Sequence, residues 1–156
     1  MNDISIKVFV TNKFEETQKL SEDFAKKLGN YNIIALYGDL GSGKTTFVQG
    51  LAKGLGITRR IISPTFIILR SYKLKSQIPN LKSQKVKFFY HVDLYRIKDE
   101  NDIEGLGIDE IIRNKENIVV IEWAEKISNI LPPNRWDIKF EHLKDDKRKI
   151  TISKLI

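Results

Sequence analysis

The sequence of 156 residues contains no cysteine, only two histidines, and no uninterrupted apolar run of the roughly 18 residues that a membrane span needs. Without cysteine there is no disulfide framework and no thiolate metal site. Two histidines, His91 and His142, argue against a histidine-rich zinc site. The first ten residues lack the cationic start and long apolar stretch of a signal peptide. We therefore expect a soluble cytoplasmic protein that contacts no membrane.

The composition is that of a globular protein, with 41% hydrophobic and 30% charged residues. The net charge is +7, and a basic surface can attract nucleic acid. The 27 lysines and arginines are spread along the chain, however, which favours an ordinary solvated surface over a dedicated nucleic-acid patch. No repeat, low-complexity segment or linker divides the sequence, so we expect a single domain over residues 1–156.

Hydrophobic periodicity predicts an α/β fold. Two short apolar runs rich in β-branched residues, 33–37 and 118–121, are typical of parallel strands buried on both faces. Two antiparallel hairpins are expected, a long one with a basic tip at Lys73–Lys85 and a terminal one around 144–148. The expected strands are 4–10, 33–37, 65–72, 86–95, 118–121, 137–142 and 149–153. Four helices are expected. The first is capped by Thr11 and ends at Gly29-Asn30; the others lie at 44–54, in the later part of 99–113, and at 125–130. Together they predict a P-loop NTPase-like domain with a mixed, mainly parallel central sheet flanked by helices.

A glycine-rich loop follows the first apolar run and matches the pattern G-x-x-x-x-G-K-[ST]. Its backbone N–H groups can turn inward around one anion, and the following helix adds the positive end of its dipole. Lys44 can reach the outer phosphates of a nucleotide, and the Thr45 hydroxyl can ligate Mg²⁺; the spacing favours Thr45 over its neighbour Thr46. We therefore predict that ATP and Mg²⁺ bind here. The predicted binding residues of the loop are Gly38, Asp39, Leu40, Gly41, Ser42, Gly43, Lys44, Thr45 and Thr46.

A second constellation follows the apolar run 118–121. P-loop proteins place an acid at the end of a neighbouring buried strand to help hold magnesium. Glu122 stands at that position, with Glu in place of the usual Asp, and is the second predicted metal ligand. Trp123 is interpreted as a wall of the same site or as a partly buried core aromatic.

Two further segments carry polar groups. In the stretch 91–96, the two-residue period of a strand puts His91, Asp93 and Tyr95 on one face. Burying three such side chains without partners is costly, so we expect this face to line a cleft and not to pack in the core. Asp93 could orient the attacking water or accept its proton, or it could hydrogen-bond to the groups that ligate the magnesium. Arg96 could pair with a phosphate, with Glu122 or with nothing. Ser63-Pro64-Thr65 lies where switch segments of P-loop proteins occur, so a hydroxyl there could sense the terminal phosphate.

These residues, in this order and spacing, resemble the TsaE family of small bacterial ATPases of tRNA threonylcarbamoyladenosine biosynthesis. The resemblance extends from about residue 11 to residue 148. It is carried by the glycine loop, Ser63-Pro64-Thr65-Phe66, His91-Val92-Asp93-Leu94-Tyr95-Arg96, Gly105-Leu106-Gly107 and Ile121-Glu122-Trp123. Val92 departs from the larger apolar residue that is usual there, and the basic tip at Lys73–Lys85 is long.

The resemblance implies an α/β P-loop fold, magnesium at Thr45 and Glu122, and an essential acid at Asp93. It also implies that the helix start at Thr11–Thr17 lies near the base of the bound nucleotide. Family members act with a threonylcarbamoyl transferase and its inactive paralogue, which perform the transfer. Whether this protein contacts tRNA itself or only indirectly stays open.

Three other functions remain open from the residues themselves. A small-molecule kinase would normally carry an arginine-rich lid, and Arg59-Arg60 is the only arginine pair. A regulatory GTPase would need Asn-Lys-x-Asp, whereas residues 114–117 end in Asn117. ATP could also act without hydrolysis, as a clamp that orders segments for a partner protein. No evident arginine finger appears in the motifs, so we expect slow hydrolysis by the isolated protein.

Overall fold

The computed structural model describes residues 5–62, 68–75 and 85–155, and its seven strands form one sheet in the order β1-β7-β6-β2-β5-β4-β3. The strands are β1 (Ser5–Thr11), β2 (Ile33–Tyr37), β3 (Leu69–Lys73), β4 (Phe88–Asp93), β5 (Asn117–Glu122), β6 (Arg135–His142) and β7 (Arg148–Leu155). The helices are α1 (Phe14–Ala25), α2 (Lys44–Gly54) and α3 (Ile108–Arg113), with the 3-10 turns η1 (Glu100–Asp102) and η2 (Ala124–Ile127).

The centre of the sheet is parallel and its margins are antiparallel. Strand β2 pairs in parallel with both β5 and β6, and β5 pairs in parallel with β4. The pairs β3–β4, β6–β7 and β1–β7 are antiparallel. The predicted mixed α/β sheet with two antiparallel hairpins is thus confirmed. Because β2, β4 and β5 run in the same direction, their carboxyl ends meet at one edge of the sheet.

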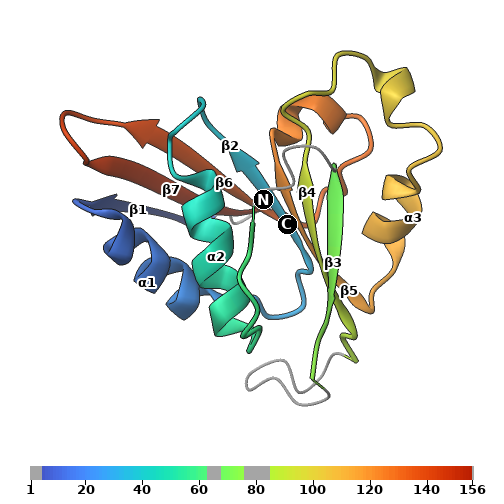
Figure 1. Ribbon diagram of the computed structural model, residues 1–156, viewed down its shortest axis with the longest axis horizontal. Coiled ribbons are helices and arrows are strands. Elements are labelled where there is room, and N and C mark those ends of the chain that lie inside the picture. The colour runs from blue at the N-terminus through green and yellow to red at the C-terminus, as the bar shows by residue number, and fades with distance from the viewer. Residues whose placement is uncertain (1–4, 63–67, 76–84, 156) are drawn as a thin grey trace.

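The two faces of the sheet bury two separate apolar clusters. On β2, Ile34 and Leu36 pack on the side of α1 and α2, whereas Ile33 and Ala35 pack on the side of α3 and η2. Figure 1 shows α1 and α2 together on one side of the sheet and α3 on the other. This is why the run 33–37 is apolar throughout instead of alternating. Beyond this centre, an apolar row on β1 stays exposed: Ile6, Val8 and Val10.

Helices α1 and α2 touch closely because α2 carries a glycine where they meet. A Cβ atom added at Gly50 would lie 2.0 Å from Ser21 Oγ and 2.2 Å from the Gln18 carbonyl oxygen. A side chain at position 50 would therefore force the two helices apart. No helix of the described residues is long and apolar enough to cross a membrane.

Several predicted boundaries are wrong. Thr11 does not cap α1: it is the last residue of β1, its hydroxyl hydrogen-bonds to that of Thr17 (2.7 Å), and the N-cap is Lys13. Helix α1 ends at Ala25, four residues before Gly29, because the chain tightens into turns there. The helix expected at 125–130 is the 3-10 turn η2, which begins at Ala124. The predicted segment Ser63–Thr65 and most of the basic hairpin tip lie outside the described residues.

Candidate nucleotide and magnesium site

The glycine loop turns sharply between β2 and α2. Gly38 has φ 149°, and a Cβ atom there would lie 2.7 Å from both the Phe140 carbonyl oxygen and Ser42 Oγ. The loop ends at Gly43, the N-cap of α2, which has φ 106°. Both conformations exclude ordinary side chains, so the two outer glycines of the motif are needed for the path of the backbone.

The Lys44 side chain folds back over this loop. Its ammonium donates to the carbonyl oxygens of Gly38 and Asp39 (2.8 Å to the latter) and lies 4.3 Å from the centre of the Trp123 ring. Burial lowers the pKa of Lys44, and the charge of Glu122 is the strongest of the nearby carboxylate effects that oppose this. The lysine predicted to meet phosphate is thus a partly desolvated cation, which strengthens its attraction for an anion.

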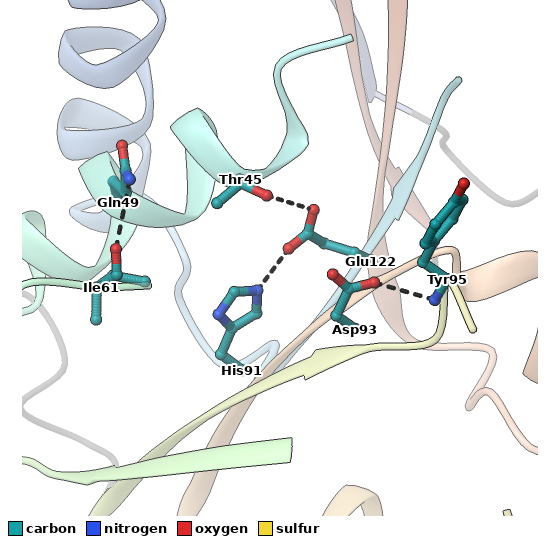
Figure 2. Close-up of polar contacts among 7 residues, drawn as sticks. All are labelled: Thr45, Gln49, Ile61, His91, Asp93, Tyr95 and Glu122. Atoms are coloured by element: carbon teal, nitrogen blue, oxygen red, sulfur yellow. Dashed lines mark hydrogen bonds and ion pairs between the residues drawn. The ribbon is translucent and has the colours of Figure 1, made fainter. Parts of the chain in front are cut away.

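The two predicted metal ligands are in direct contact. Thr45 Oγ1, in the first turn of α2, donates to Glu122 Oε1 (2.9 Å), and His91 Nε2 lies 2.6 Å from Glu122 Oε2 (Figure 2). Glu122 is the last residue of β5 and is only 2% exposed. A hydroxyl and a carboxylate are oxygen donors of the kind that Mg²⁺ prefers, and magnesium sites usually add phosphate oxygens and waters to one or two such ligands. The donor set therefore fits Mg²⁺ bound together with a nucleotide, and the described residues hold no larger cluster of metal-ligating side chains.

Asp93 ends the strand next to β5. The register places Asp93 directly beside Glu122, so the two carboxylates leave the sheet at the same edge. Asp93 is partly buried, and its Oδ1 accepts the backbone N–H of Tyr95 (3.0 Å, Figure 2). This bond fixes the side chain at the turn after β4. His91, two residues earlier, is fully buried, so the expectation that it faces a cleft is wrong.

A cavity of about 630 Å³ opens over these groups. It is bounded by the start of α1, the glycine loop, the ends of β4 and β5, and the turn between β6 and β7. Its lining residues are Lys13, Phe14, Thr17, Leu40, Gly41, Gly43, Lys44, Thr45, Thr46, Ile68, Asp93, Tyr95, Arg96, Glu122, Trp123, Asp146 and Arg148. The volume and the polar groups at one end are typical of a small-molecule site.

Trp123 forms one wall of this cavity. Its backbone lies in the left-handed region with φ 60°, which is rare for a large side chain, and strained residues of this kind cluster at active sites and ligand clamps. Its ring contacts Tyr95 (5.3 Å between ring centres) as well as the ammonium of Lys44. Of the two interpretations that the sequence allowed, the structure supports the wall.

Most of the predicted site residues meet at this cavity, but not all. The loop residues Gly38, Asp39 and Ser42 belong to the turn but do not line the cavity. Thr11 is buried and does not line it either. Ser63 and Thr65 lie outside the described residues. The cavity does reach the start of α1 through Lys13, Phe14 and Thr17.

The sequence offered Arg96 as a partner for phosphate, but it gave no role in the cavity wall to Arg148. Arg96 and Arg148 both line the cavity, and Arg148 Nη2 donates to the Gly41 carbonyl oxygen (3.3 Å). Arg148 comes from the terminal hairpin, 107 positions away, which reaches the loop because β6 pairs with β2. No motif marks this contact. The sequence predicted only a terminal hairpin around residues 144–148, with Arg148 in its turn.

The sheet order, with a glycine loop between β2 and α2 and an acidic residue at the end of the adjacent β5, defines a P-loop NTPase-like α/β domain. Comparison with known proteins identifies the family. A family model described as "Threonylcarbamoyl adenosine biosynthesis protein TsaE" matches residues 11–150. The chain therefore belongs to the TsaE family.

Individual relatives agree with this assignment. The tRNA threonylcarbamoyladenosine biosynthesis protein TsaE of Bacillus subtilis is 41% identical over 142 residues, covering 89% of this chain and 80% of the relative. The protein of the same name from Rickettsia bellii is 38% identical over 145 residues, covering 92% of each chain. The crystal structure of Bacillus subtilis YdiB superimposes with a TM-score of 0.75 at 31% identity, covering 98% of this chain and 88% of YdiB.

Proposed function

We propose that this protein binds ATP with Mg²⁺ in the cavity, hydrolyses the ATP, and thereby serves the threonylcarbamoyl modification of adenosine in tRNA. The observation that carries the proposal is the contact between Thr45 and Glu122, which brings two magnesium-type oxygen donors from different elements to the start of α2. A glycine loop alone would be compatible with an inert turn. The loop, the paired donors and the cavity together are what a nucleotide with its metal requires.

Each group has a definite task in this proposal. The backbone N–H groups at the start of α2 and the Lys44 ammonium hold the outer phosphates. Thr45 and Glu122 hold Mg²⁺, which when bound neutralises charge on the phosphate oxygens. Asp93, at the same edge of the sheet, orients the attacking water and accepts its proton. The start of α1, with Lys13 and Phe14, and the hairpin residue Arg148 also line the cavity.

The binding part is tested with Lys44→Ala. Loss of hydrogen bonds to a charged group costs about 1.5–3 kcal/mol, so calorimetric titration should show ATP affinity in Mg²⁺ falling roughly 10- to 100-fold. Lys53→Ala, on the exposed last turn of the same helix, is the matched control and should bind as the wild type does. Equal affinities for both variants would refute the assignment of the loop.

The biological part rests on the family and on the names of its members. By resemblance the partners are the threonylcarbamoyl transferase and its inactive paralogue, and the compartment is the cytoplasm. The isolated protein should hydrolyse ATP slowly, and ordering of the site by the partners should raise the rate. An arginine supplied in trans raises the rate of such sites by about 10³ or more.

Cells that carry Asp93→Asn or Glu122→Gln in place of the wild-type protein test this role. Nucleoside mass spectrometry of their tRNA should show a loss of threonylcarbamoyladenosine. Normal modification in both variants would contradict the role and favour a small-molecule kinase.

A further inference from the structure

His91 is a fully buried polar side chain with one hydrogen-bond partner among the described residues. It lies on β4, is 0% exposed, and its Nε2 lies 2.6 Å from Glu122 Oε2 (Figure 2). Its other ring nitrogen, Nδ1, has no hydrogen-bond partner in the described part of the chain. Burying an imidazole with half of its polar capacity unused is unfavourable. Packing alone would favour an apolar residue at this position. The contact with Glu122 is the interaction that His91 makes and that an apolar residue could not make.

The contact with Glu122 sets a requirement on the tautomer of the ring. A carboxylate that binds a metal is ionised and only accepts, so Nε2 must carry the proton for His91 to donate to Glu122 Oε2. The contact is made by Nε2, and Nδ1 is buried without a partner in the described part of the chain.

This bond divides the two oxygens of Glu122 between two partners. Oε2 is held by His91 on β4, and Oε1 is left pointing at Thr45 Oγ1 on α2. Three elements of the fold thus meet at one carboxylate. A glutamate side chain has three rotatable bonds, and the second anchor removes the freedom to turn Oε1 away from Thr45.

We propose that His91 is a positioning residue, which orients Glu122 so that a single carboxylate oxygen is presented to Mg²⁺ beside the Thr45 hydroxyl. The inference rests on the proposed magnesium function of Thr45 and Glu122. Residues that orient metal ligands in this way typically change metal affinity by about 10- to 100-fold when they are replaced. His91 itself touches neither the metal nor the nucleotide.

The test separates binding of the nucleotide from the gain that Mg²⁺ adds. ADP affinity is measured by calorimetry in EDTA and in Mg²⁺ for the wild type, His91→Leu and His91→Gln. His91→Leu removes the donor, whereas the amide of His91→Gln keeps an N–H near the position of Nε2. His142→Gln is the matched control, since His142 lies at the turn between β6 and β7 and bonds the Asp145 carbonyl oxygen.

We expect His91→Leu to bind ADP in EDTA as the wild type does, but to lose about 10- to 100-fold of the affinity gained from Mg²⁺. His91→Gln should recover most of that gain, and His142→Gln should lose none. Equal loss in EDTA and in Mg²⁺ would show a merely structural role and overturn the proposal, as would an unchanged Mg²⁺ gain in His91→Leu. Failure of the wild type to bind ADP under either condition would instead remove the proposed function.

A measurement on the wild type keeps the proposal testable if His91→Leu does not fold. Nitrogen NMR of the imidazoles, assigned with His142→Gln, should show His91 as the Nε2–H tautomer. A ring protonated on Nδ1 alone would have no proton to donate to Glu122 and would overturn the proposal.

Discussion

The ends of strands β4 and β5 carry two carboxylates that the same register brings together, yet their surroundings differ. Glu122, at the end of β5, is 2% exposed and has a partner on each oxygen, Thr45 and His91. Asp93, at the end of β4, is partly buried, lines the cavity, and accepts a hydrogen bond from the turn that follows it. Identical chemistry at adjacent strand ends has been placed in two different environments.

The difference assigns the two groups different tasks. A carboxylate held at both oxygens has one orientation, which suits a ligand for a small ion with strict geometry. A partly exposed carboxylate that lines a cavity can contact a solvent molecule there and accept a proton from it. Replacing each acid by its amide keeps the shape of the side chain but removes its charge and one of its two acceptor oxygens, so paired substitutions test the division directly.

The largest effect is expected for Asp93→Asn. The amide cannot accept a proton, so single-turnover hydrolysis should fall by about 10²- to 10⁴-fold, while ATP affinity in Mg²⁺ stays within a few-fold of the wild type. Asp109→Asn, which changes a half-exposed aspartate on α3 that pairs with Arg113, controls for the general loss of a negative charge. A wild-type rate in Asp93→Asn would reduce Asp93 to a structural residue. Wild-type modification of tRNA in cells, despite lost hydrolysis, would support the clamp hypothesis.

Glu122→Gln should produce the opposite pattern. Its amide keeps one oxygen but loses the negative charge, so we expect the Mg²⁺-dependent gain in ADP affinity to fall at least about 10-fold. Affinity in EDTA should not fall, because Glu122 is not expected to touch the phosphates. Glu125→Gln, an exposed glutamate three residues along, is the control. If Glu122→Gln changed hydrolysis alone and Asp93→Asn changed the Mg²⁺ gain, the two assignments would have to be exchanged.

A smaller, spectroscopic effect should come from Trp123, which adjoins Glu122 and contacts Lys44. Trp136→Phe leaves Trp123 as the single tryptophan, and its fluorescence should change when ATP and Mg²⁺ are added. Trp136 is a suitable residue to remove because it packs edge-on against Phe24 and donates to the Leu28 carbonyl oxygen, away from the cavity. The reverse variant, Trp123→Phe, should give no nucleotide-dependent signal. A signal from Trp136 alone would move the nucleotide away from the β5 end.

The smallest effect concerns the end of β2, which carries a phenol rather than a carboxylate. Burial, followed by the charge of Asp137, raises the pKa of Tyr37 to about 12. An unfolded tyrosine ionises near pH 10, so between about pH 10 and 12 the unfolded state binds fewer protons and the free energy of unfolding falls as pH rises. Below that window the contribution is fully present. Urea unfolding at several alkaline pH values should show a shallower decline for Tyr37→Phe, and Tyr95→Phe, at an exposed site, should decline as the wild type does.

Local patterns were enough for much of the fold. The runs 33–37 and 118–121 indicated strands buried on both faces, and both lie at the centre of the sheet. The helix 44–54 was predicted with its observed bounds, because the glycine loop sets its start. Boundaries failed where tertiary contacts compete with local signals: Thr11 has the chemistry of a cap, but strand pairing with Arg148 and the bond to Thr17 take it into β1.

By itself, the sequence determined the chemistry available to this protein. It contains a glycine loop that can surround phosphate, a lysine and a threonine at fixed spacing, and acids at the ends of apolar runs, because each of these signals depends only on residues near one another in the chain. Tertiary structure decided which groups meet. The pairing of β4 with β5 brought His91 to Glu122, and the pairing of β6 with β2 brought Arg148 to Gly41. Strand order and register are set by burial over the whole sheet, and no local spacing encodes them.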